Sequence, residues 1–244
     1  APIVEITSFS VLQDWTSATQ TFRETGQTHN IVKILDNYDL NCLKEFSDEI
    51  FEVRAREIIK GESAINAKIE LQNIKMNETP FTKLKERLLI IFENFKKDNI
   101  DNVFYAVKYC DEFGLTQQGF TLFIEYIISK VISDCEILTD KEDLYDIELR
   151  SVVSSALSLT SVARFKFDRY DDEKKETYFL IVNKIFELPY KKKLTKDIYF
   201  SLSSGGRNDL NHGGFRPIGE AKSTGHFKNK LKEYIIRYEK LIIQ

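Results

Sequence analysis

An arginine and a histidine near the C-terminal end have the residue types and spacing for chemistry on a phosphate. Asn208 follows Arg207 directly, and His212 comes five residues after the arginine, within the stretch SSGGRNDLNHGGF (203–215). An arginine can hold a phosphate through two parallel hydrogen bonds, an amide can orient it, and a histidine can move a proton near neutral pH. These groups are the parts of phosphodiester chemistry that needs no metal ion.

The spacing alone does not bring Arg207 and His212 together. Five residues of an α-helix turn through about 500°, so the two side chains point about 140° apart. A shared site therefore needs a distorted turn or a second chain. Glycine pairs flank the motif and free the backbone to distort. A glycine-rich surface loop whose histidine only caps a helix is the alternative, and the motif alone does not decide between them.

Length and composition predict a folded, helix-rich chain with a buried core. The 244 residues are 42% hydrophobic, with 10 Gly and 4 Pro. Apolar runs such as Leu88–Phe92 are too short to cross a bilayer, and the start of the chain has no signal-peptide pattern. Cys42, Cys110 and Cys135 are widely spaced and lack accompanying histidine pairs. We therefore expect reduced thiols, a cytoplasmic location, no metal site, no cofactor and no membrane association.

The net charge of −3 is unevenly distributed along the chain. Residues 184–244 carry 13 Lys and Arg against 6 Asp and Glu, so this part has a charge of about +7. The motif lies inside it, where an anionic ligand would be attracted. A solvated basic face is the other interpretation of the same charges.

Apolar residues recur at helical spacing along most of the chain, and no alternation of strands and helices is present. The helices expected are residues 8–25, 31–35, 41 to about 61, 63–74, one starting at Pro80, 101–114, 116 to about 137, 149–164, 178–188 and 226–243. Only over residues 63–74 does the pattern fail to separate a helix from a strand, and a helix is favoured there. The chain is thus predicted to be all-α and a single domain over residues 1–244, with N-terminal helices at 1–80 and a helical core at 81–244.

Three stretches resemble one family. Arg207-Asn208-x-x-x-His212 resembles the R-x4-6-H signature of HEPN ribonucleases, in which a polar residue, often Asn, follows the arginine. ITSFSVLQDWTSATQTFRETGQTHNIVKIL (6–35) and AVKYCDEFGLTQQGFTLFIEYI (106–127) are similar to the helical region of CRISPR-associated CARF–HEPN effectors of type III systems. The Rossmann-like CARF domain of that family, which senses cyclic oligoadenylate, has no counterpart in this sequence. We therefore expect an excised effector domain or a stand-alone HEPN protein, on which cyclic oligoadenylate acts only through a sensor domain that this chain lacks.

The resemblance implies an HEPN-like helical bundle with additional helices. It also implies a metal-independent endoribonuclease that cleaves single-stranded RNA by attack of the 2′-hydroxyl. Its active site would be shared across a homodimer, and its role would be type III CRISPR antiviral defence. In this interpretation Arg207 clamps the scissile phosphate, Asn208 orients it or the histidine, and His212 transfers protons. A non-catalytic HEPN dimerisation or RNA-binding module and an HEPN toxin of a toxin–antitoxin pair are the alternatives.

Weaker candidates for RNA contacts surround the motif. Ser203 and Ser204 can hydrogen-bond a phosphate or simply cap a helix. Arg216 and Lys222 follow the motif closely and are either phosphate contacts or solvated side chains. The run Lys191–Lys193 is either a linker or a further phosphate-facing patch.

Overall fold

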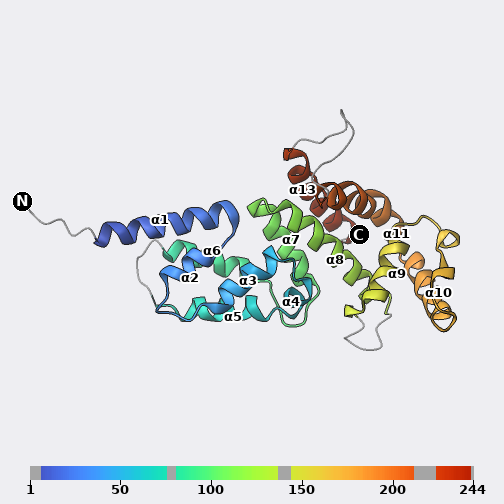
Figure 1. The fold of residues 1–244 in the computed structure, drawn as a ribbon, viewed down its shortest axis with the longest axis horizontal. Helices are drawn as coiled ribbons and strands as arrows, with labels where there is room; N and C mark the ends of the chain where they lie inside the picture. The colour runs from blue at the N-terminus through green and yellow to red at the C-terminus, as the bar shows by residue number, and fades with distance from the viewer. Residues whose placement is uncertain (1–6, 76–80, 137–143, 212–223, 243–244) are drawn as a thin grey trace, which may run out of the picture. The chain divides into compact units, whose positions relative to one another are not determined.

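The computed structural model describes residues 7–75, 81–136, 144–211 and 224–242, and every regular element in these ranges is helical (Figure 1). The expectation of an all-α chain is confirmed. Residues 63–74, whose pattern did not separate a helix from a strand, lie mostly in a helix. The chain divides into two compact units, Ala1–Gln118 and Gly119–Gln244. The division falls in the first turn of one helix, Thr116–Asp134.

The first unit is built from seven α-helices in its described part. They are α1 (Thr7–Thr25), α2 (His29–Ile34), α3 (Asn41–Phe51), α4 (Ala55–Lys60), α5 (Glu62–Asn73), α6 (Phe81–Phe92) and α7 (Asp101–Phe113). Aromatic rings fill its centre: Phe46 of α3 lies 4.8 Å from Phe92 and 5.5 Å from Tyr109, measured between ring centroids. Trp15 of α1 packs on Phe81 of α6 at 5.4 Å.

Helix α6, the first helix after residue 80, belongs to the first unit. Helix α6 packs on α5 and buries Phe81, Leu84 and Leu88 in the core of the first unit. The Nζ atom of Lys85 also donates a hydrogen bond to the carbonyl of Ile74 at 2.7 Å. Helices α6 and α7 therefore complete the core of the first unit.

The single helix expected over residues 41 to about 61 is instead two, α3 and α4. The break contains Val53, which has a φ of 59°, a left-handed conformation that valine disfavours. The predicted stop at Gly61 is confirmed: its φ is 72°, and an added Cβ would lie 2.5 Å from the carbonyl oxygen of Lys96. Close by, the amide of the buried Asn102 donates to the carbonyls of Ile58 and Ile59 at 3.1 and 3.2 Å. Tertiary contacts thus fix the end of α4.

The second unit surrounds the apolar helix α8 (Thr116–Asp134), which is buried along most of its length. The elements that follow are α9 (Ile147–Leu157), the 3₁₀ turns η2 (Val162–Arg164) and η3 (Phe167–Arg169), α10 (Asp172–Glu187), α11 (Lys191–Leu194), the π-helical segments η4 (Thr195–Tyr199) and η5 (Ser201–Arg207), α12 (Asn208–Asn211) and α13 (Thr224–Ile242). Helix α13 packs on α8 through rings, among them Tyr238 on Phe123 at 5.6 Å.

Two predicted helices of the second unit have other bounds. Helix α9 starts at Ile147 because the Asp146 carboxylate accepts a hydrogen bond from the Leu149 amide at 2.6 Å. It stops at Leu157, so the helix expected over 149–164 was too long. Residues 162–164, the last of that expected range, form the turn η2. Helix α10 begins six residues before the expected start at residue 178.

The run Lys191–Lys193 is not a linker but forms most of α11. Lys191 is 4% exposed, its ammonium group lies 3.6 Å from the centre of the Phe186 ring, and it donates to the carbonyl of Leu159. Burial lowers the pKa of Lys191 to about 8. This lysine therefore serves the core, whereas Lys192 and Lys193 are exposed.

Candidate functional site

The motif begins in a π-helical segment held against α8 by a glycine. Gly206 of η5 is buried, and a Cβ added to it would lie 2.1 Å from the Cε1 atom of Phe120. The Phe120 ring is 1% exposed and packs on Phe227 and Tyr234 of α13 at 6.2 Å each. Only a glycine permits this approach of η5 to α8. Because π-helical turns occur frequently at functional sites, η5 is a candidate site on its geometry as well as on its sequence.

Arg207 is the last residue of η5 and Asn208 the first of α12. The Arg207 side chain is half-buried and Asn208 is exposed. Burial raises the pKa of Tyr199, and the positive charges of Arg207 and Arg150 oppose that shift. The guanidinium of Arg207 therefore lies within electrostatic range of a buried phenol, while Asn208 faces solvent.

A buried polar network ties this part of the molecule to α8 and α9. The Tyr199 hydroxyl donates to Ser154 Oγ of α9 at 2.9 Å. One turn earlier on α9, Arg150 Nη2 pairs with the Glu125 carboxylate of α8 at 2.6 Å, and its Nη1 donates to Ser129 Oγ at 3.0 Å. Arg150 has these fixed partners and a 17% exposed side chain, so it is not available to a ligand.

Several predicted site residues lie outside the part of the chain that the structure describes. His212, Arg216 and Lys222 are among them, and the Ser204 side chain is too, although its backbone belongs to η5. Ser203 Oγ donates to the carbonyl of Phe200 at 3.4 Å, a local contact within the helix. Among the described residues, Arg207 thus lies near Tyr199. That Arg207 and His212 share one site stays a prediction.

Sequence reasoning missed the buried network and the π-helical backbone. Tyr199 and Ser154 are 45 residues apart, and Arg150 and Glu125 are 25 apart, so no local spacing links them. The one usable signal was the pair Gly205-Gly206, which indicated a backbone that departs from an α-helix.

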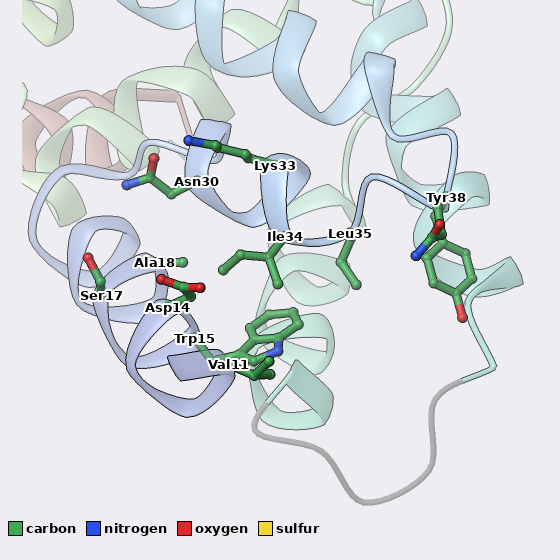
Figure 2. A pocket seen from close by; sticks show the side chains of 11 residues that line it. Val11, Asp14, Trp15, Ser17, Ala18, Asn30, Lys33, Ile34, Leu35 and Tyr38 are labelled. Atoms are coloured by element: carbon green, nitrogen blue, oxygen red, sulfur yellow. The ribbon is translucent and has the colours of Figure 1, made fainter. Parts of the chain in front are cut away.

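A pocket of about 660 Å³ lies in the first unit, between α1 and α2 (Figure 2). Figure 2 shows Ile34 lying above Trp15, with Asn30 and Lys33 coming from α2. Its lining is Val11, Asp14, Trp15, Ser17, Ala18, Asn30, Lys33, Ile34, Leu35, Asn37 and Tyr38. The volume is that of a ligand pocket, and the lining includes no histidine, no cysteine and a single carboxylate, that of Asp14.

The thiols are poorly suited to nucleophilic chemistry. All three cysteines are free, and Cys110 and Cys135 are buried. Burial raises the pKa of Cys135 to about 12, and burial together with the neighbouring Glu70 does the same for Cys42. Thiolates are the reactive form, so these groups are inert near neutral pH.

Two further properties concern only the described ranges. No helix in them is long and apolar enough to cross a membrane. No group of three His, Cys, Asp or Glu side chains in them is arranged to hold a metal ion.

Comparison of the chain with family models, with curated proteins and with solved structures found no match in any of the three.

Proposed function

We propose that the chain is a metal-independent endoribonuclease of the HEPN type that cleaves single-stranded RNA in the cytoplasm, as part of type III CRISPR antiviral defence. The observation that supports this most is the position of Arg207. It ends a π-helical segment fixed on α8 by Gly206, its side chain is partly open to solvent, and the exposed Asn208 follows it. His212, five residues further, supplies the titratable group.

The chemistry follows from these residue types. One histidine removes the proton of a ribose 2′-hydroxyl, and the 2′-oxygen forms a bond to the adjacent phosphorus. The bond from phosphorus to the 5′-oxygen breaks, and that oxygen takes a proton from a second histidine. Arg207 stabilises the charge that grows on the phosphate oxygens. The products are a 2′,3′-cyclic phosphate and a 5′-hydroxyl, and DNA is excluded because it has no 2′-hydroxyl.

A second copy of the chain supplies the second histidine. One imidazole cannot readily act as base and acid in the same step, and a two-fold axis brings a second copy of a motif opposite the first. The homodimer also removes the problem that Arg207 and His212 point about 140° apart on an α-helix.

The competing function is a non-catalytic RNA-binding or dimerisation module. The half-burial of Arg207 near Tyr199 favours it, because an arginine that serves the fold would lie in such a place. The two functions are distinguished by variants of the motif: only in the nuclease should a substitution of Arg207 or His212 abolish RNA cleavage while the protein still folds.

The test is cleavage of a fluorescently labelled single-stranded RNA in EDTA. Arg207→Ala and His212→Ala are each expected to lower the rate by about 10²-fold or more, and the wild type should leave cyclic-phosphate ends. His226→Ala and Arg169→Ala are matched controls of the same residue types and should cleave like the wild type. Equal cleavage by all the proteins would refute the assignment, and no cleavage by a dimeric wild type would favour the non-catalytic module.

A further inference from the structure

A basic groove lies in the second unit, between the helical stretch that leads to the motif and the last helix. We call it the η4–α13 groove. It holds about 250 Å³ and is lined by Lys193, Asp197, Ile198, Arg237, Lys240 and Leu241. Three of these side chains are cationic and one is a carboxylate, so an anion is attracted to it.

Arg237 is a fixed wall of this groove. Its Nη1 atom donates to the backbone carbonyl of Asp197 at 3.2 Å, which ties α13 to η4. Its Nη2 atom pairs with the carboxylate of Glu233 on α13. Both of these bonds hold the guanidinium in place, so Arg237 shapes the groove more than it offers a free charge.

Lys193 and Lys240 are the two available charges. Both are exposed, and neither forms an ion pair with a carboxylate among the residues described. An ammonium group binds phosphate as a point charge without demanding a particular geometry. Ile198 and Leu241 add an apolar surface that offers no hydrogen bond for reading a base.

The groove and the motif share one uninterrupted helical stretch. Residues 191–211 run through α11, η4, η5 and α12 without a break. Asp197 and Arg207 are ten residues apart in it, which corresponds to no more than about 15 Å along the axis. A single phosphate cannot reach both places, but a chain of phosphates can.

We propose that the η4–α13 groove binds the sugar–phosphate backbone of single-stranded RNA, a few nucleotides from the phosphate held by Arg207. This inference rests on the proposed function, because it takes its ligand from that reaction. Contacts to phosphate fix the register of a nucleic acid and carry no sequence information. The groove therefore contributes affinity that depends on salt and not on base sequence.

Binding is measured by fluorescence anisotropy of a short labelled single-stranded RNA at several salt concentrations, using the full chain with His212→Ala to prevent cleavage. The groove variant adds Lys193→Gln and Lys240→Gln. Its matched control adds Lys166→Gln and Lys228→Gln, two exposed lysines outside the groove, and so has the same net charge.

The groove variant is expected to bind RNA about tenfold more weakly than its control, with a salt slope shallower by about 0.7 for each phosphate that the protein no longer neutralises. Equal affinities and slopes would overturn the inference, and the nuclease proposal would still stand if the wild type cleaves RNA. Groove-dependent binding by a chain whose wild type cleaves nothing would support the groove and reject the nuclease. Polyglutamate that binds in the groove where RNA does not would reject RNA as the ligand.

Discussion

Tyr199 links Arg207, a motif residue that the structure describes, to the core of the second unit. Its side chain is buried, its hydroxyl donates to Ser154 Oγ at 2.9 Å, and its pKa responds to the charge of Arg207. We expect Tyr199 to act as a positioning residue beneath η5, since its ring is not open to a substrate.

Tyr199→Phe should lower the free energy of unfolding by about 0.5–1.5 kcal/mol, because it deletes a buried hydrogen bond and leaves the packing of the ring intact. Chemical denaturation measures the change. Tyr234→Phe is the control: Tyr234 is also buried in the second unit, and its hydroxyl has no hydrogen-bond partner among the described residues. A destabilisation of equal size in both variants would show that the bond to Ser154 contributes nothing.

Glu49 makes the stability of the first unit depend on pH. Burial raises the pKa of this α3 carboxyl from 4.5 to about 7, against the opposing hydrogen bond from Ser63 Oγ at 2.6 Å. The folded state therefore binds the proton more tightly than the unfolded state. The resulting stabilisation is complete below the unfolded pKa and is lost as the pH rises through about 7.

Glu49→Gln, which cannot ionise, should match the wild type in melting temperature at about pH 5 and exceed it at about pH 8, since only the wild type gains a buried charge there. Thermal unfolding at the two pH values checks this. Glu62→Gln, at an exposed carboxyl of α5, should show no such divergence. A constant difference between Glu49→Gln and the wild type would contradict the raised pKa.

At the scale of elements, glycines marked helix ends that the sequence could predict. Gly26, Gly61 and Gly114 have φ values of 74°, 72° and 70°, which glycine adopts at little cost. The break at Val53 was not predictable, because valine, unlike glycine, gives no sign in the sequence of a left-handed conformation; local backbone hydrogen bonds accompany it, from Val53 to Ile50 at 3.2 Å and from Arg54 to Glu49 at 2.8 Å. The spacing to His212 made Arg207 and Asn208 candidates, and their role stays a prediction; no sequence pattern pointed to Tyr199, whose pKa shows the charge of Arg207.

The packing of η5 on α8 is tested with Gly206→Ala. The new Cβ would overlap the fully packed Phe120 ring, so we expect a decrease of about 1–3 kcal/mol in the free energy of unfolding, together with reduced RNA cleavage as Arg207 is displaced. Gly225→Ala in α13 meets no atom within 4 Å and should be neutral or stabilising by up to about 1 kcal/mol. Unchanged stability in Gly206→Ala would mean that η5 does not depend on this contact.

At the scale of the whole molecule, the proposed site is complete only in a dimer. An excess of His212→Ala subunits mixed with wild type should therefore reduce RNA cleavage below that of the same amount of wild type alone, because mixed dimers have only one functional histidine. His226→Ala subunits should instead add their own activity. Strictly additive rates in the first mixture would show that each chain works by itself.

The two π-helical segments have a consequence for how this chain tolerates changes in length. A π-helix closes hydrogen bonds five residues apart where an α-helix closes them at four, so each π turn accommodates one residue more. Deleting one residue from Ser201–Arg207 would allow an ordinary α-helical turn to follow the same path. The residues that follow the deletion would then keep their directions, because the π turn had absorbed the additional residue. In evolution, insertion or deletion of a single residue at this point would be absorbed within the segment, while α12 and the core helices keep their sequence.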